Sequence, residues 1–238
     1  MKLFKKISKR SSIKSINKGF LSNIGRLTQL MASGKRNEEE VRRWCIDVLR
    51  SGMGYSDDQI ETEFKIMGQR VDIAIKIKGV VCLVIECKAA TVKLNDACVL
   101  QASRYAVGLG AEWAAVTNGH CWQLYHVTPS TGIEPEIQQI FDVSILDEDG
   151  ISEEDSDNLY LLTEQAMTSG ETKEVFHQQN CLSFERILEA LKSEDVMVAI
   201  SKKVEESYKK NMGVTVDVKP EWISDIMQEM FEIFINGE

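Results

Sequence analysis

The sequence predicts an α/β domain to about residue 145, followed by a mainly helical region. Short apolar runs bounded by glycine turns alternate with helical patterns in the first part. One of them, residues 80–85, is continuously apolar, which is typical of a central strand covered on both faces. After residues 147–157, apolar residues recur at spacings of three and four, which indicates helices.

The composition excludes several classes of protein. The 238 residues are 43% hydrophobic and 27% charged with only 3 prolines, so the chain is neither wholly disordered nor collagen-like. No apolar run approaches the roughly 18 to 20 residues that span a bilayer, and we expect no membrane partner. The six cysteines form no CxxC pair, which favours reduced, buried thiols and a cytoplasmic location. Nothing near His120-Cys121 in the sequence completes a zinc site.

The net charge of −9 conceals a basic N-terminal arm. Residues 1–36 carry ten Lys or Arg and no acid, whereas residues 37–238 carry 18 basic and 37 acidic side chains. An amphipathic helix is predicted there, with Ser11 and Ser12 as candidate N-caps. Its apolar stripe comprises Ile13, Ile16, Phe20, Ile24, Leu27 and Leu30. Three interpretations stay open: a helix that covers part of the core, a contact with nucleic-acid phosphates, and an organelle-targeting peptide.

The elements of the α/β domain follow from periodicity and turn residues. Asn37 opens a helix over residues 38–49, whose apolar stripe is Val41, Cys45, Val48 and Leu49. Strands are predicted at 60–66, 71–77, 80–87, 113–117 and 122–127, with a helix at 96–107 before the last two. The Asn118-Gly119 dipeptide between the last two strands is a strong hairpin signal.

The region after residue 145 begins with a stretch rich in acidic residues. Residues 147–157 hold seven acids in eleven positions, which we interpret as a solvated linker or loop. Two helical stripes follow: Met197, Ile200, Val204 and Tyr208, and then Ile223, Ile226, Met230 and Phe234. The predicted division is therefore a basic arm over 1–36, an α/β core over 37–145, and an acidic linker with a helical region over 146–238.

One group of charged residues indicates chemistry. Asp72 stands at the head of one predicted strand, and Glu86-Cys87-Lys88 ends the next. Glu86 and Lys88 project to one face and Cys87 to the other, because alternate strand residues face opposite ways. The carboxylates of Asp72 and Glu86 could hold Mg²⁺ and polarise a phosphodiester, while Lys88 orients or activates the attacking water. The alternative is a solvated rim of mixed charges.

Two further features favour a site. Glu38 lies three residues before Val41, in line with the apolar stripe of its helix, where a lone acid is costly to bury. Gln101 and Tyr105 lie four residues apart and share a face of the next helix. The alternative for this second pair is a surface amide and a half-buried tyrosine.

A helical Glu, then Asp, then ExK, then QxxxY resembles the PD-(D/E)xK nuclease superfamily. The chain is more closely similar to the nuclease domain at the N-terminus of type I restriction enzyme R subunits, over roughly residues 37–145. The matching stretches are EEEVRRWCIDVL (38–49), GYSDDQIETEFKI (54–66), GQRVDIAIKI (68–77), VCLVIECKAA (81–90), QASRY (101–105) and VTNGHCWQLYHV (116–127).

The resemblance implies a fold and a set of roles. The fold is a restriction-endonuclease-like αβββαβ core with a mixed sheet and helices on both faces. Asp72 and Glu86 would be metal ligands, with the main-chain carbonyl of Cys87 as a further one, and Lys88 the catalytic lysine. Glu38 would be the helical acid that supports the metal, with Glu39 as the fallback. Gln101 and Tyr105 would position DNA.

The sequence also departs from the pattern. Val71 precedes Asp72 where superfamily members often have Pro, and no GxxxxGK[ST] phosphate loop occurs, so we expect no ATP-driven motor. The expected function is a DNA endonuclease that uses Mg²⁺, with Mn²⁺ as a substitute. The alternatives are a non-catalytic module that binds nucleic acid or a protein, and an RNA-directed or regulatory nuclease whose substrate a partner complex sets.

The helices after residue 180 carry large apolar residues beyond the nuclease-like core, among them Trp222 and Phe231. We hypothesise that they pack on the flank of the core or against a second copy. In a homo-oligomer, paired sites could cut both strands of DNA, and light scattering at high micromolar concentration would show whether one forms.

Overall fold

The computed structural model describes residues 2–34, 37–66, 68–132, 134–146 and 151–236. The chain forms two compact units, one ending at Phe176 and the other beginning at His177. No helix in the described part of the chain is both long and apolar enough to span a membrane. Cys45, Cys87 and Cys98 are buried, Cys82 and Cys121 are partly buried, and Cys181 is exposed.

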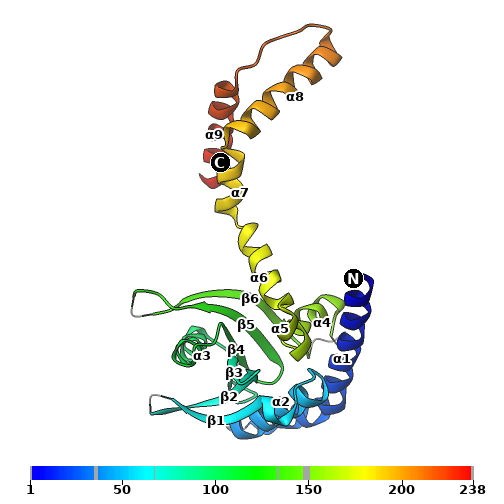
Figure 1. Ribbon diagram of the computed structural model, residues 1–238, viewed down its shortest axis with the longest axis vertical. Coiled ribbons are helices and arrows are strands. Elements are labelled where there is room, and N and C mark those ends of the chain that lie inside the picture. The colour runs from blue at the N-terminus through cyan, green and yellow to red at the C-terminus, as the bar shows by residue number, and fades with distance from the viewer. Residues whose placement is uncertain (1, 35–36, 67, 133, 147–150, 237–238) are drawn as a thin grey trace. The chain divides into compact units, whose positions relative to one another are not determined.

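The first unit is built on one six-stranded sheet with its strands in chain order (Figure 1). The strands are β1 (Ile60–Ile66), β2 (Gln69–Ile77), β3 (Val80–Cys87), β4 (Trp113–Thr117), β5 (Cys121–Thr128) and β6 (Glu136–Ser144). Only the β3–β4 pair is parallel, and α3 (Asp96–Leu109) makes the crossover between these strands. The predicted α/β fold with a mixed sheet is confirmed, including the β4–β5 hairpin. Strand β6 was not predicted.

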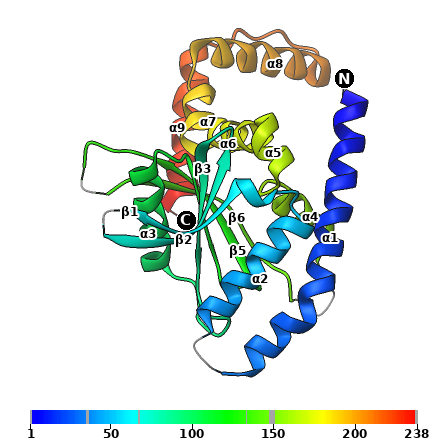
Figure 2. The same cartoon turned by 60° about the horizontal axis from the view of Figure 1, so that its bottom comes forward.

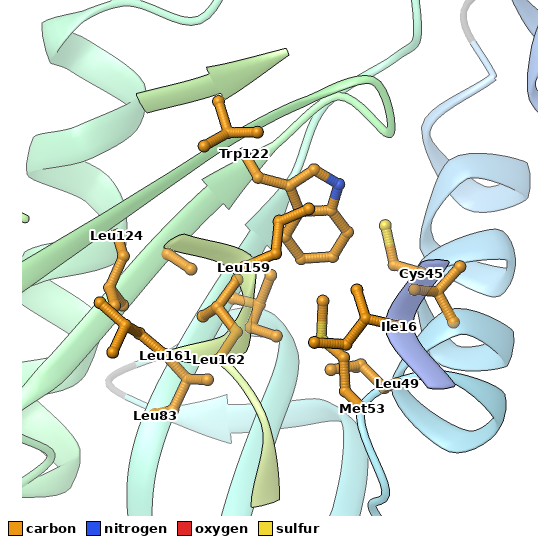
Figure 3. Packing of buried hydrophobic residues seen from close by; sticks show 14 of the residues in the cluster. Ile16, Cys45, Leu49, Met53, Leu83, Trp122, Leu124, Leu159, Leu161 and Leu162 are labelled. Carbon is orange, nitrogen blue, oxygen red and sulfur yellow. The ribbon is translucent and has the colours of Figure 1, made fainter. Parts of the chain in front are cut away.

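Helices cover both faces of the sheet (Figure 2). Helix α3 lies on one face, where its buried residues pack with Val84 and Val116 of the sheet. Helices α1 (Lys2–Ala32) and α2 (Glu38–Ser51) lie on the other. There the side chains of Ile16, Cys45, Leu83 and Trp122 converge (Figure 3). Leu83 and Ile85 therefore enter one apolar cluster and Val84 enters the other, which is why this part of β3 is continuously apolar.

Helix α1 is the predicted amphipathic helix, and it covers the core. Ile16, Phe20 and Leu27 are wholly buried, and Phe20 packs edge-on against Trp122 with ring centroids 6.1 Å apart. The helix starts at Lys2, so the prediction of Ser11 and Ser12 as N-caps is wrong. Both serines lie inside the helix, because residues 2–10 contain no Pro or Gly that would end it. Phosphate contact by the basic residues of this helix stays a prediction.

Helices α1 and α2 run antiparallel, and their backbones meet at Gly19 of α1 and Gly52, the C-cap residue of α2. A Cβ atom on Gly19 would lie 2.6 Å from the Cα of Gly52, which is closer than real atoms approach. Farther along, Trp44 of α2 donates from Nε1 to the Asn23 carbonyl of α1 at 2.8 Å. Trp44 was missing from the predicted stripe, but it is wholly buried. The missing side chains at Gly19 and Gly52 allow the two helices to pack backbone to backbone.

The acidic stretch is not a loop throughout. Residues 147–150 lie outside the described residues, but α4 (Glu153–Tyr160) begins within the stretch, so the loop prediction is wrong from Glu153 onward. Ser152 caps this helix by accepting a hydrogen bond from the Asp155 amide at 3.0 Å. Acidic residues in a first turn are favourable because they face the positive end of the helix dipole.

The first unit extends beyond the predicted core on both sides. Leu159 to Leu162 and Ala166 are buried in the same cluster as α1 and α2. They come from α4 and from the segment that leads into α5 (Glu164–Ser169). A 3-10 turn, η1 (Asp57–Gln59), precedes β1. The boundary between the two units, after Phe176, falls within α6 (Glu171–Cys181).

The second unit is helical, as predicted. It contains α7 (Phe184–Leu191), α8 (Glu194–Met212) and α9 (Pro220–Asn236), and Gly213 caps α8 in the left-handed conformation. Among its described residues only Met197, Ser201 and Ile223 are buried. The other members of the two stripes are partly or fully exposed, except that the side chain of Phe234 lies outside the described part. The homo-oligomer stays a prediction.

The glycine contact yields a test on stability. Gly19→Ala should lower the free energy of unfolding by about 1–3 kcal/mol, because the methyl group forces α1 away from α2. Gly25→Ala is the matched control in the same helix, since a Cβ atom there meets no described atom within 4 Å. It should raise the free energy of unfolding by roughly 0.5–1 kcal/mol through helix propensity. Urea denaturation of both variants measures these changes, and equal effects would contradict the close contact.

Candidate active site

The predicted acids meet near the end of β3, on two neighbouring strands inside the sheet. Ile73 of β2 pairs with Ile85 of β3, so the next residues outward, Asp72 and Glu86, come to the same place on adjacent antiparallel strands. Lys88 follows directly after β3, and its main-chain amide donates to the Thr117 carbonyl at 2.7 Å, which fixes the backbone at the strand end. Cys87 lies in the opposite cluster with Cys45, as the strand alternation predicted.

Hydrogen bonds connect these residues to one another and to α3. The Cys87 amide donates to Asp72 Oδ2 at 2.9 Å, and Lys88 Nζ donates to Glu86 Oε1 at 2.6 Å. Lys88 Nζ also donates to Gln101 Oε1 at 3.3 Å, and Gln101 Nε2 donates to the Tyr105 hydroxyl at 3.2 Å. The ExK strand and the QxxxY helix are therefore joined through Lys88.

Burial and mutual repulsion disfavour the negative charges. Burial raises the pKa of Glu86 to about 7, and the negative charge of Asp72 adds to this shift. Burial also raises the pKa of Asp72, against the opposing effect of the Cys87 amide. The charge of Glu38 raises the pKa of both acids further. Glu38 itself is exposed at the start of α2, so it acts on the acids through its charge.

Lys88 stays cationic. Burial lowers the pKa of Lys88, but its hydrogen bond to Glu86 and the charges of Glu86 and Glu38 raise it, so the pKa lies above its ordinary value. The Lys88 side chain lies mostly out of solvent, with 16% of it exposed.

The carboxylates fit a hard divalent cation. Glu86 is 3% exposed, and its Oε2 atom has no hydrogen-bond partner among the described residues. Such an orphaned buried oxygen beside a second carboxylate is the type of ligand that Mg²⁺ prefers. The described residues contain no group of three or more His, Cys, Asp and Glu side chains that could hold a metal. A cation at Asp72 and Glu86 would therefore need other oxygens, such as main-chain carbonyls or water.

Gln101 and Tyr105 share a face of α3, as predicted from their spacing. With Ala97, Leu100 and Arg104 they line an open hollow of about 410 Å³. Tyr105 is buried, with its hydroxyl group held by Gln101, so it is not the half-buried surface tyrosine of the alternative.

Asn37 plays a part that its sequence position does not indicate. It precedes α2, but its side chain makes no capping hydrogen bond. Instead its Oδ1 accepts from the Ala90 amide at 3.0 Å, and its Nδ2 donates to the Leu30 carbonyl at 2.7 Å. This buried amide therefore ties the end of α1 to the segment that follows Lys88.

Arg42 is the second residue that the sequence reasoning missed. Its Nη1 atom lies 3.6 Å from Asp72 Oδ1, and its Nη2 atom pairs with Glu39. A signal was available, because Arg42 is four residues after Glu38 and shares its helix face. Glu39 is also paired with Arg43 at 3.0 Å. Glu39, the fallback for Glu38, is thus engaged with two arginines.

Comparison with known proteins gives a family that this region resembles. Residues 37–143 match the family model described as "Type I restriction enzyme R protein N terminus (HSDR_N)". The resemblance predicted from the sequence is confirmed. The matched region, which we term the R-like domain, runs from Asn37 to within β6 and contains every candidate site residue.

Comparisons with solved structures and with curated proteins give weaker matches or none. A solved structure that matches is described as "Characterization and crystal structure of the type IIG restriction endonuclease BpuSI", with 13% identity and a TM-score of 0.39. The match covers 59% of this chain and 18% of that one, so this chain spans under a fifth of that protein's length. The curated proteins contain no match.

The pKa of Glu86 predicts a stability that depends on pH. The pKa rises from 4.5 to about 7 on folding, so folding favours the protonated acid and the free energy of unfolding falls as the pH rises between these values. Glu86→Gln mimics the neutral acid and removes this loss. In metal-free buffer the variant should gain on the parent by about 2–3 kcal/mol between pH 5 and pH 8.

Urea denaturation at the two pH values measures the difference. Asp142→Asn is a suitable control, because Asp142 is an exposed acid that pairs with Gln123 in the same unit. A constant difference between the Glu86 variant and the parent at both pH values would contradict the assigned burial.

Proposed function

We propose that this protein is a divalent-cation-dependent nuclease that hydrolyses DNA phosphodiester bonds at Glu38, Asp72, Glu86 and Lys88. One observation carries the proposal: the buried, unpartnered Oε2 atom of Glu86 lies in a pair of acids whose pKa values are both raised. This pair lies within a domain that resembles a restriction enzyme R protein N terminus. DNA is the substrate that this resemblance favours.

Asp72, Glu86 and the main-chain carbonyl of Cys87 would hold Mg²⁺, or Mn²⁺ in its place. Such a cation polarises a phosphodiester and neutralises charge that develops on it. Asp72 is prepared for a ligand role because the Cys87 amide occupies Oδ2 and leaves Oδ1 without a hydrogen bond among the described contacts. Glu38 would add negative charge that draws the cation to the two ligands.

Lys88 would act as a fixed positive charge. Its raised pKa keeps the amine protonated near neutral pH, so the role of general base does not suit it. Hydrogen bonds to Glu86 and Gln101 hold the ammonium in place from two sides. A cation fixed in a poorly hydrated site stabilises negative charge on the phosphate and orients the attacking water.

Gln101 and Tyr105 would place the substrate. Tyr105 fixes the amide of Gln101, which in turn faces Lys88. The hollow that the two residues line beside Arg104 is open to solvent and polar, so a nucleic-acid backbone could enter it. The proposed reaction needs no ATP, because the sequence has no phosphate-binding loop of the GxxxxGK[ST] type.

The test is cleavage of plasmid DNA by the purified protein with Mg²⁺ or Mn²⁺, beside calorimetry with Mn²⁺. Asp72→Ala should weaken Mn²⁺ binding and abolish nicking together, because it removes a ligand. Lys88→Ala should keep Mn²⁺ binding similar or slightly tighter, yet lower the rate by about 10² to 10³ or more. Gln101→Ala should affect DNA placement more than Mn²⁺ binding.

Lys173→Ala serves as the control for Lys88, because Lys173 is also paired with a glutamate, Glu112, at 2.8 Å. It should nick DNA like the parent. If Asp72→Ala and Lys88→Ala both cleave like the parent, the site is misassigned. A folded parent that binds DNA without nicking would favour the non-catalytic module instead.

A further inference from the structure

Strand β1 has an irregular residue at the point that faces Asp72. Thr62 pairs with Ile73 and Phe64 pairs with Val71, which leaves Glu63 and Asp72 opposite each other between these pairs. Glu63 has φ of 53°, in the left-handed region that glutamate rarely adopts. Backbone strain of this kind persists where surrounding contacts impose it, and it often marks functional sites. The contacts that impose this backbone conformation are those of the Glu63 carboxylate.

The Glu63 carboxylate binds two arginines. Its Oε1 atom lies 3.0 Å from Arg70 Nη1 and 3.5 Å from Arg42 Nη1. Arg42 is only 12% exposed, and its guanidinium also pairs with Glu39 on its own helix. Arg42 is thus fixed from α2 by Glu39 and from β1 by Glu63, and so it is held beside the carboxylate of Asp72.

Asp72 and Arg42 form a loose charge pair, in which a metal cation could take the place of the guanidinium. Asp72 Oδ2 is occupied by the Cys87 amide at 2.9 Å. Oδ1 faces Arg42 Nη1 at 3.6 Å, a distance that is long for a hydrogen bond but within reach of a charge interaction. Arg42 therefore supplies positive charge at the oxygen that the proposed function assigns to the metal, without occupying it by a close contact.

We propose that Arg42 is a positioning residue, which Glu39 and Glu63 hold beside Asp72 and which competes with the divalent cation for Asp72 Oδ1. The inference rests on the proposed function, because it presumes a cation at Asp72. Arg42 keeps the Asp72 carboxylate compensated and oriented before the cation arrives, and it lowers the affinity for that cation. The strained backbone of Glu63 is the cost of directing a carboxylate at Arg42.

Calorimetry with Mn²⁺ alone, without DNA, tests this inference. Arg42→Gln should tighten Mn²⁺ binding by roughly three- to tenfold, because a positive charge near the ion is removed. Arg70→Gln is the matched control: it also takes one guanidinium from Glu63, but no contact joins Arg70 to Asp72 among the described ion pairs. It should change the affinity by less than about twofold.

Two more variants separate charge from shape. Arg42→Lys keeps the positive charge, so its Mn²⁺ affinity should stay close to that of the parent. Glu63→Gln removes one anchor and lets Arg42 move toward Asp72, so it should weaken Mn²⁺ binding more in the parent than in the Arg42→Gln background. Thermal unfolding without metal identifies variants that have lost the fold.

The outcomes distinguish this inference from the proposed function. If the parent binds Mn²⁺ and Arg42→Gln binds it equally or more weakly, Arg42 only fastens α2 to β1 and the inference is overturned, while the metal site stands. If tightening occurs equally in Arg70→Gln, a general loss of positive charge explains it and the inference also fails. A folded parent that binds no Mn²⁺ would overturn the metal site and this inference with it.

Discussion

Negative charge removed from water is the constraint on which the rest of this site depends. Strand β3 is buried on both faces, and its next-to-last residue, Glu86, lies in the interior beside Asp72 of β2. Burial of a carboxylate costs free energy unless a partner compensates it. Lys88, the Cys87 amide and Arg42 each compensate part of this charge, yet the pKa values of both acids stay raised. The surrounding contacts thus supply too little positive charge to balance the two carboxylates of Asp72 and Glu86.

Much of the fold could be predicted from the sequence, because the strands differ clearly from the turns between them. Strands β1 and β3 and the hairpin strand β4 begin and end at the predicted residues. Strand β6 could not be recognised, because Gln138 and Gln139 interrupt its apolar pattern and the ladder with β5 shifts register between Leu124 and Tyr125. The start of α4 was hidden for a different reason: the acids that suggested a solvated loop are also favourable in the first turn of a helix.

The candidate site divides in the same way. Glu86 with Lys88, and Gln101 with Tyr105, are related by spacings of two and four residues, so local geometry predicted that each pair shares a face. Asn37 and Glu63 could not be found in that way, because their contacts with Ala90 and Arg42 join separate elements. For Arg42, spacing indicated only the helix face that it shares with Glu38, and its approach to Asp72 depends on how α2 packs on the sheet. Glu63 also depends on a left-handed backbone in the middle of a strand, which no sequence pattern indicates.

The N-terminal helix has a consequence for how the protein is made. Besides α2, which follows it directly, its partners come from much later in the chain: Asn17 accepts a hydrogen bond from Ser156, Ser12 donates to Gln165, and Phe20 packs on Trp122. Contacts at such sequence separation form slowly, because closing a long loop costs conformational entropy before the contacts can stabilise the structure. During synthesis α1 is made before the residues that supply these contacts, so they form only when almost the whole first unit has followed it. The segment after Lys88, which Asn37 ties to the end of α1, therefore gains its last support only when synthesis of this unit is nearly complete.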